Sequence, residues 1–259
     1  KGPWADVKAF GAVGNGTTDD TTAIQAALTY GMANGVGVYF SPGTYLITST
    51  VSFSGHSNYI FGNGQRSVLY TTSNISMLKF DTSVAGFYNT IEGLTFVANV
   101  SGTRTSNVGL EIGTAFGGHQ SYNRFTNLRF EGTYYGIRMT KVSTTDELQF
   151  DWNSFDRIQT ANVGALNCEY GIRFDYGSGT GNVFSILNFV TTTVGIDFAA
   201  GNNANNIGDI IISGLHNGGG GIGVRGAGNA NYRERIQVHA AQFDGGLVTG
   251  LSFTNYNHI

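Results

Sequence analysis

Two short motifs that repeat along the chain constrain the fold more than any other feature of the sequence. The first begins with an asparagine followed by alternating apolar positions, and it starts at Asn89, Asn123, Asn153, Asn182 and Asn205. The second has the form G-[IL]-x-apolar, and it starts at Gly109, Gly136, Gly171, Gly195 and Gly221. The two motifs alternate strictly, so the chain repeats one structural unit several times.

Both motifs place apolar residues at every second position, which predicts half-buried β-strands. Two or more strands in a unit shorter than about 40 residues indicate a solenoid coil rather than a propeller blade. Strands that recur once per coil in the same direction pair in parallel, about 4.8 Å apart. We therefore predict an all-β fold, a right-handed parallel β-helix. We interpret its motif asparagines as a ladder at one corner and its motif glycines as turn or bulge residues.

The first fifty residues have a different pattern, which predicts a cap. A helix over about 21–30 would begin after Asp19 or Asp20 and present an apolar face that includes Ile24 and Leu28. A solenoid must cover its open end, because exposed strand edges and core invite aggregation. We therefore expect a cap over residues 1–50 and β-helix coils over 51–259, within one domain.

Composition excludes several classes of protein. Only 12% of the residues are charged, the net charge is −3 and no basic run occurs, so we expect no nucleic-acid partner. No apolar run approaches the length of a membrane span. Cys168 is the single cysteine, which excludes an intrachain disulfide. Because the chain begins at Lys1 rather than Met, we expect an excised part of a longer chain.

The cap carries a family resemblance. The run V-K-x-F-G-A-x-G-N-G-x-x-D-D-x-x-A-I-Q-A-A from Val7, followed by V-Y-F-x-P-G-T-Y from Val38, resembles the opening of the pectate-lyase-3-like branch of the pectin-lyase superfamily. That branch includes bacteriophage tailspike depolymerases, glycosidases and alginate epimerases. The resemblance implies a polysaccharide substrate, a homotrimer and an extracellular or virion location.

The alternation also predicts which side chains face outward. The Gly-type strands would present an outward row, which consists of Glu111, Arg138, Arg173, Asp197 and Gly223. One interpretation is a solvated face with cross-coil ion pairs, Glu111 with Arg138 and Arg173 with Asp197. The other is a groove for an anionic or neutral glycan, with the arginines as ligands. The Asn-type strands would present a mostly uncharged row of Thr95, Arg129, Gln159, Asn188 and Ile211.

Unequal loops predict where a wall would stand over this face. The connections 113–122 and 140–152 are long, whereas the equivalent ones after them are short. Long loops beside short ones favour a binding site. The long loops carry His119, Tyr122, Asp146, Glu147, Asp151 and Trp152. Trp152 would either stack on a sugar ring or fill a gap in the core.

Asp175 and Asp197 are the predicted catalytic pair. Two positions along the strand and one coil across give a separation of about 8 Å, which fits the window of about 6.5–9.5 Å for an inverting glycosidase. The loop acids Glu147 and Asp151 are the alternatives for either role. A lyase would instead need Tyr or His as base and Arg138 or Arg173 against a uronate carboxylate. We expect no cofactor, and calcium at Asp146, Glu147 and Asp151 is the alternative.

The sequence thus predicts a tailspike-like polysaccharide depolymerase, with a hydrolase favoured over a lyase. The predicted substrate-binding residues are Arg138, Arg173, Trp152, Glu147, Asp151 and Glu111. Two alternatives remain open: a glycan-binding module without catalysis, and a structural spacer of a fibre.

Overall fold

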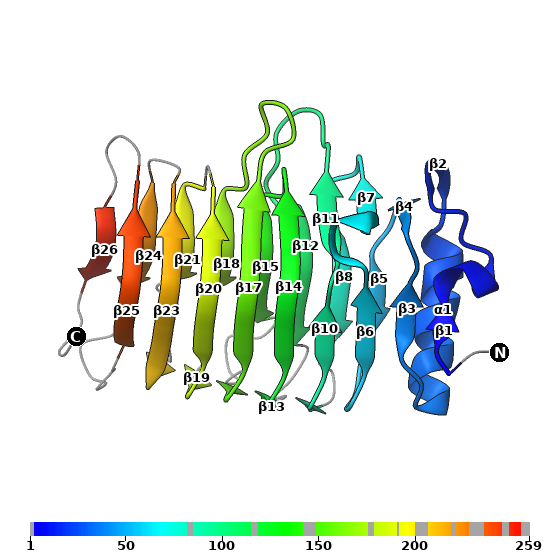
Figure 1. The fold of residues 1–259 in the computed structure, drawn as a ribbon, viewed down its shortest axis with the longest axis horizontal. Coiled ribbons are helices and arrows are strands. Elements are labelled where there is room, and N and C mark those ends of the chain that lie inside the picture. The colour runs from blue at the N-terminus through cyan, green and yellow to red at the C-terminus, as the bar shows by residue number, and fades with distance from the viewer. Residues whose placement is uncertain are drawn as a thin grey trace.

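The computed structural model describes residues 3–81, 85–114, 119–141, 149–175, 179–190, 192–199, 207–218, 221–227, 236–244 and 249–254. The chain forms a right-handed parallel β-helix with a helix at its N-terminal end (Figure 1). Every pair of named strands is parallel, as the repeats predicted. The one isolated antiparallel bridge within the described residues joins Val163 and Leu166, in a connection between strands.

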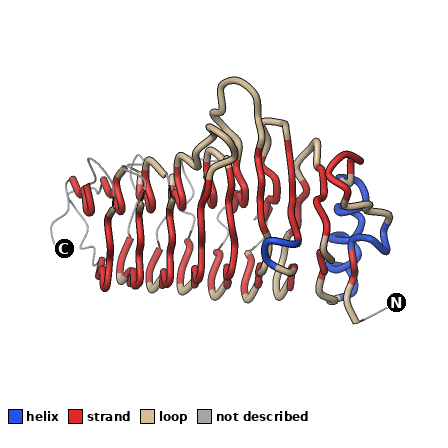
Figure 2. The backbone as a smooth tube through the Cα atoms, turned by 45° about the horizontal axis from the view of Figure 1, so that its top comes forward, coloured by secondary structure: helices blue, strands red, loops and turns tan. Residues whose placement is uncertain are grey.

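The strands lie in long sheets that run the length of the molecule (Figure 2). The 13-stranded sheet contains β1 (Ala5–Asp6), β2 (Asn15–Asp19), β3 (Val38–Phe40), β4 (Gly43–Leu46), β6 (Tyr59–Gly62), β7 (Ser67–Thr71), β10 (Thr90–Glu92), β11 (Thr95–Ala98), β14 (Arg124–Glu131), β17 (Ser154–Ala161), β20 (Val183–Phe189), β23 (Ile210–Asn217) and β25 (Ile236–Phe243). The 8-stranded sheet contains β5 (Val51–Phe53), β8 (Ser76–Asp81), β12 (Val108–Thr114), β15 (Tyr135–Lys141), β18 (Tyr170–Phe174), β21 (Val194–Phe198), β24 (Ile222–Ala227) and β26 (Thr249–Thr254).

The fold also contains two short sheets, which are separate from the long ones. One consists of β9 (Gly86–Phe87), β13 (His119–Ser121) and β16 (Gln149–Asp151), and the other of β19 (Gly179–Thr180) and β22 (Ile207–Gly208). Two connections, 99–107 and 162–169, project beyond the strand ends (Figure 1). Arg104 ties them together, because its Nη1 donates to the backbone oxygens of Gly132 and Asn167 at 2.7 and 2.8 Å.

The core is a set of aromatic and aliphatic stacks between the sheets. Phe125, Phe155 and Phe184 occupy the same position on successive coils, and their ring centroids lie 5.0 and 4.8 Å apart. All three are fully buried. The coil spacing therefore lets one residue type fill the same layer repeatedly, which is why the apolar positions recur in the sequence.

The asparagines of the first motif form a continuous buried ladder. Asn89, Asn123 and Asn153 each donate through Nδ2 to the Oδ1 of the asparagine on the next coil, at 2.9, 3.0 and 3.2 Å, and the last acceptor is Asn182. The ladder begins one coil earlier than predicted, at Asn58, whose Nδ2 donates to Asn89.

The ladder also ends one coil earlier than predicted. Val183 pairs with Ile211, so Ile210 occupies the position in line with Asn182. Asn205 lies outside the described residues, and its predicted register is wrong because it precedes that position by five residues. The same shift puts His216, rather than Ile211, in the outward row with Gln159 and Asn188.

The motif glycines on the 8-stranded sheet allow close approach between coils. A Cβ on Gly136 would lie 2.5 Å from the backbone oxygen of Gly171, and one on Gly171 would lie 2.6 Å from that of Gly195. The strand ladder skips each of these glycines on both paired strands, so neighbouring strands stay in register across them and no extra residue is inserted. At the next coil the skipped residue is Gly223, so the motif there begins at Gly223 and not at Gly221.

The cap closes the N-terminal end of the coils. Helix α1 (Thr21–Asn34) is longer than predicted and buries Ile24 and Leu28 against the first coils. Asp19 accepts from the backbone N–H of Thr21 at 3.0 Å. Asp20 is the N-cap residue but makes no capping bond, because its buried carboxylate accepts from the backbone N–H groups of Val13 and Gly14. No helix in the described ranges has the length and apolarity that a membrane crossing needs.

Candidate functional site

The outward row of the 8-stranded sheet carries a continuous group of charged side chains. Register places Glu111, Arg138, Arg173 and Asp197 side by side on β12, β15, β18 and β21. The fifth member is Arg225 on β24, not the predicted Gly223, because Asp197 pairs with Arg225. A charged row of this kind stands out in a chain with so few charges.

Asp197 lies between Arg173 and Arg225 in this row and is enclosed by them. Its Oδ1 accepts from Arg225 Nε at 2.7 Å, and its Oδ2 accepts from Arg225 Nη2 and Arg173 Nη1, both at 2.8 Å. The exposed fraction of its side chain is 0%. Asp197 points away from the core, as the alternation predicted, but the two guanidinium groups cover it.

Asp175 lies directly after β18 and meets the same arginine. Its Oδ1 accepts from Arg173 Nε at 2.5 Å and its Oδ2 from Arg138 Nε at 2.6 Å. Its backbone N–H donates to the oxygen of Met139, which fixes it beside β15. One guanidinium, that of Arg173, therefore bridges Asp175 and Asp197, and Arg138 and Arg225 close the two ends. We call these five residues the arginine–aspartate network.

Two tyrosines flank the network. The guanidinium carbon of Arg138 lies 4.4 Å from the ring centre of Tyr135, and that of Arg173 lies 4.8 Å from the ring centre of Tyr170. Cation–π contacts of this kind orient the arginines. Burial raises the pKa of the Tyr135 hydroxyl above its usual value, which holds the hydroxyl in its neutral form.

The carboxylates also act on the arginines. The side-chain hydrogen bonds with Asp197 raise the pKa of Arg225 above its usual range. Burial lowers the pKa of Arg173, but its hydrogen bond and charge interactions with Asp175 and Asp197 outweigh that effect and raise the pKa overall. Both arginines therefore stay charged at every pH at which the fold persists.

Of the two predicted ion pairs, one is present. Arg173 contacts Asp197 as predicted, but Arg138 contacts Asp175 instead of Glu111. Glu111 accepts from the hydroxyl groups of Ser76 and Thr140. It therefore joins the row through neutral partners.

The predicted wall residues do not all gather at the network. Glu147 and Asp146 lie outside the described residues. Asp151 ends β16, and its Oδ1 accepts from the backbone N–H of Thr180 at 2.8 Å. Trp152 lies in the turn between β16 and β17, a different corner of the coil from the 8-stranded sheet. It does not fill the core, since 56% of its surface is exposed.

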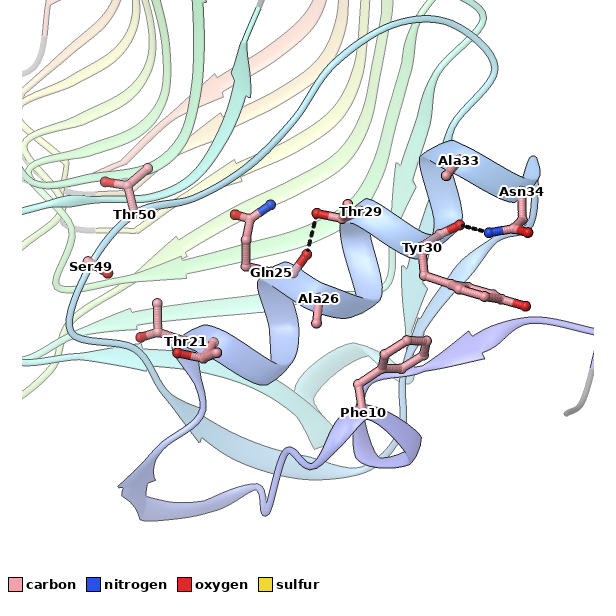
Figure 3. A pocket seen from close by; sticks show the side chains of 11 residues that line it. Phe10, Thr21, Gln25, Ala26, Thr29, Tyr30, Ala33, Asn34, Ser49 and Thr50 are labelled. Atoms are coloured by element: carbon pink, nitrogen blue, oxygen red, sulfur yellow. Dashed lines mark hydrogen bonds between the residues drawn. The ribbon is translucent and has the colours of Figure 1, made fainter.

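A hollow lies elsewhere, on the cap. A shallow groove of about 670 Å³ follows the outer face of α1 and is lined by uncharged residues that include Phe10, Gln25 and Tyr30 (Figure 3). Its polar side chains bond within the cap and to the first coil: Thr29 Oγ1 donates to the oxygen of Gln25, and the Gln25 side chain bonds the backbone of Ser52. The groove therefore belongs to the cap and offers no acid, base or charge for catalysis. Among the described residues, no three His, Cys, Asp or Glu side chains gather as a metal site requires.

Comparison with known families identifies the lineage of this fold. The family model described as Rhamnogalacturonase A/epimerase, pectate lyase-like, matches residues 4–245. The chain belongs to this family. The match confirms the resemblance that residues 6–45 carry, and it extends through most of the coils.

Solved structures resemble this member of the rhamnogalacturonase/epimerase family in fold. ORF18 of Geobacillus virus E2 superposes with a TM-score of 0.61 at 17% identity, over 95% of this chain and 50% of that one. The A-module of the mannuronan C-5 epimerase AlgE4 of Azotobacter vinelandii superposes with a TM-score of 0.53 at 18% identity, over 92% of this chain and 76% of that one. At these identities the likeness establishes the fold alone.

A short stretch of this family member also matches a curated sequence. A protein of Arthroderma benhamiae described as "Probable glucan endo-1,3-beta-glucosidase" is 58% identical over 45 residues. These residues are 17% of this chain and 5% of that protein. The chain therefore spans a small part of this relative and half of the viral structure.

Sequence reasoning missed two parts of the site. Arg225 escaped because Gly221, in GIGV, fits the glycine motif whereas Gly223, in GVRG, does not, and only the register shows that Gly223 holds the motif position. Tyr135 and Tyr170 escaped because strict alternation would place them inside. They stand outside because the glycine after each of them faces the core instead: a Cβ on Gly136 would meet the ring of Phe130, and one on Gly171 the ring of Phe189.

Proposed function

We propose that this protein binds and cleaves a polysaccharide along the outer face of its 8-stranded sheet. One observation supports the proposal above others: three arginines and two aspartates from four successive coils converge in one continuous network on that face. Membership of the rhamnogalacturonase/epimerase family makes a glycan the substrate class to test.

The arginines suit an acidic glycan. Three guanidinium groups face two carboxylates, so the network keeps one formal positive charge in excess. The side chains of Arg138 and Arg225 are also about a quarter to a third exposed, at 26% and 36%. A uronate carboxylate would take up guanidinium N–H groups that point toward solvent, because the planar fork of arginine matches a carboxylate.

Asp175 and Asp197 are the proposed catalytic pair. In an inverting hydrolysis, one carboxyl gives a proton to the glycosidic oxygen while the other takes a proton from the attacking water. Asp175 is the more accessible of the two, with 9% of its side chain exposed against 0% for Asp197. Before either carboxylate acts, a substrate hydroxyl or a water must replace one of its guanidinium donors. The rate would pass through a maximum as pH changes, because the reaction needs one protonated and one ionised group.

A lyase is less well supported. Elimination needs a base near the uronate C5 proton, and Tyr135 is the tyrosine whose ring lies beneath both Arg138 and Arg173. Its raised pKa opposes this role, since a neutral phenol accepts a proton poorly. On the described part of this face no histidine accompanies the arginines; the described histidines lie on other elements.

Glycan binding without cleavage is the second candidate. The four oxygens of the two carboxylates each accept at least one guanidinium N–H. A network so fully paired serves as a rigid, positively charged platform even if no bond is broken. This alternative keeps the arginines as ligands and gives the aspartates a positioning role.

We also propose that the protein works as a homotrimer outside the cell or on a virion. The family resemblance supports both, and the viral ORF18 structure shares the fold.

The test is cleavage of acidic and neutral polysaccharides. We expect new reducing ends on rhamnogalacturonan, polygalacturonate, alginate or β-1,3-glucan, without the absorbance near 235 nm that unsaturated products give. Unsaturated products would favour the lyase. Retention by a polysaccharide without any cleavage would favour the binding module.

A further inference from the structure

A strip of exposed aromatic side chains follows one corner of the β-helix, away from the network. Tyr88, Tyr122 and Trp152 lie in the turns that lead into β10, β14 and β17, one on each of three successive coils. Backbone hydrogen bonds stack these turns: Tyr88 N donates to the oxygen of Ser121, and Tyr122 N to that of Asp151. Their exposed fractions are 64%, 51% and 56%, although all three are large and mainly apolar. We call these residues the aromatic strip.

The backbone of the strip adopts a conformation that aromatic residues rarely tolerate. The φ angles of Tyr88, Tyr122 and Trp152 are 59°, 59° and 56°. Glycine and asparagine adopt this left-handed region readily, whereas a bulky side chain raises its energy. The same turn position on flanking coils holds Ser57 and Gly181. The chain thus places aromatic residues where a small or polar residue would be more stable, and then leaves them exposed.

The rings are nevertheless held in a fixed arrangement. Tyr88 and Tyr122 stack with their centroids 5.3 Å apart and their planes 13° from parallel. Trp152 lies over the next coil, where a Cβ on Gly181 would come within 2.4 Å of its ring. The buried asparagines Asn89 and Asn123 directly follow the two tyrosines and anchor both turns. The two tyrosine rings therefore stack on each other along the axis of the coils, and Trp152 continues the strip of exposed aromatic side chains on the third coil.

We propose that the aromatic strip is a second glycan-binding site, which holds a part of the polysaccharide that does not contact the arginine–aspartate network. An aromatic ring carries partial negative charge on its face, which attracts the C–H groups on the face of a pyranose ring. The coil spacing repeats an exposed aromatic side chain about every 4.8 Å, which is comparable with the length of one sugar unit. This inference shares with the proposed function only that the ligand is a glycan.

The neighbouring side chains fit a glycan better than a second protein chain. Two positions beyond the strip on the same strands, the outward residues are Thr90, Arg124 and Ser154, which offer hydrogen bonds to sugar hydroxyls. The apolar part of the strip is only one residue wide. A stable protein interface needs on the order of 800 Å² from each partner, so a partner would have to cover much more than this strip.

The experiment replaces all three aromatic residues by asparagine, in Tyr88→Asn, Tyr122→Asn and Trp152→Asn together. Asparagine tolerates a positive φ, so the triple variant is expected to fold with an unfolding midpoint equal to or above that of the wild type. The matched control is Ile186→Asn. Ile186 has a φ of 52° and is 58% exposed, but it lies on β20 outside the strip.

The measurement is affinity electrophoresis through gels that contain rhamnogalacturonan, polygalacturonate, alginate or β-1,3-glucan. We expect at least one polysaccharide to retard the wild type. The affinity of the triple variant for that polysaccharide should be lower by a factor of about ten. The Ile186→Asn control should keep the wild-type affinity. Equal retardation of the triple variant, or no retardation of the wild type by any of the four, would overturn the proposal.

Two further readouts separate this inference from others. Reducing-end assays on the same proteins test the proposed function separately. If no polysaccharide is cleaved but retardation still depends on the strip, the hydrolase proposal is wrong and the glycan-binding proposal for the strip stands. Light scattering gives the mass of each variant. If the triple variant loses subunits while Ile186→Asn does not, the strip is a contact between copies of the chain and the glycan proposal is wrong.

Discussion

Arg225 donates two hydrogen bonds to Asp197, from Nε to Oδ1 at 2.7 Å and from Nη2 to Oδ2 at 2.8 Å. This bidentate pair spans neighbouring coils and leaves Asp197 with no exposed surface. A charge so enclosed contributes to the stability of the fold as well as to any chemistry, because removing it leaves the charged groups around it without their partner. The Asp197 side chain therefore has to be tested for stability before it is tested for catalysis.

Replacement of Asp197 by alanine should destabilise the fold. Arg173 and Arg225 would lose their shared carboxylate, and breaking a buried ion pair costs about 3 kcal/mol or more of unfolding free energy. Urea denaturation followed by tryptophan fluorescence measures the change. Arg157→Ala is the control, since its pair with Asp156 is half exposed and should be worth less than about 1 kcal/mol. Equal effects of the two variants would contradict a structural role for the network.

The asparagine ladder should be most sensitive in its middle. Asn153→Ala removes the acceptor for the backbone N–H of Asn123 and the donor to the oxygen of Gln120. Each buried group left unsatisfied costs about 1–3 kcal/mol. Asn58→Ala at the end of the ladder should cost less, because Asn58 is only partly buried. Chemical denaturation of both variants decides the order, and a larger loss for Asn58→Ala would count against the ladder as a cooperative element.

Stability should fall between about pH 9 and pH 12. Burial raises the pKa of the Cys168 thiol from 9.0 to about 12, and burial raises that of the Tyr45 hydroxyl from 10.0 to about 12. The unfolded chain loses these protons at lower pH than the folded chain does. The stabilisation is therefore complete below about pH 9 and is lost as pH rises through the folded values.

Thermal unfolding from pH 8 to pH 12 tests this dependence. The midpoint should decline across the alkaline range, and Cys168→Ala should decline less steeply than the wild type. Iodoacetamide at pH 8 gives an independent check, since it should label Cys168 only after unfolding. Rapid labelling of the native protein would show that the thiol is accessible.

The proposed homotrimer predicts a mass of three chains in solution. Light scattering at micromolar concentration should give about three times 27.6 kDa. A stable monomer at that concentration would contradict the assembly that the family resemblance implies.

The sequence predicted the architecture because a β-helix repeats the same physical environment on every coil. Phe125, Phe155 and Phe184 fill one layer, and the asparagines from Asn89 onward fill one corner. A sequence pattern that recurs once per coil can be recognised without any knowledge of which residues are in contact. The cap was predictable for a different reason, since its helix has the apolar spacing and acidic start that helices share.

Register in the later coils was not predictable from the motifs. Gly221, in GIGV, fits the pattern and Gly223, in GVRG, does not, yet Gly223 holds the motif position, where a Cβ would lie 2.0 Å from the ring of Phe243, a residue on a later coil. Such a contact between distant residues decides the register and leaves no trace in the local sequence. The positive φ of Tyr122 and Trp152 was equally hidden, because aromatic residues do not favour that conformation.

The most direct test of the central claim is the turnover of Asp175→Asn on the polysaccharide that the wild type cleaves. Asp175 keeps 9% of its side chain exposed and Asp197 keeps none, so this variant disturbs the fold less than a change at Asp197. Glu131→Gln is the matched control, because it removes a carboxylate from a similar pair with Arg129 on the other long sheet. We predict that reducing-end formation falls at least a hundredfold in Asp175→Asn and stays at the wild-type rate in Glu131→Gln. Near-normal turnover by folded Asp175→Asn would contradict the claim that this network cleaves the glycan.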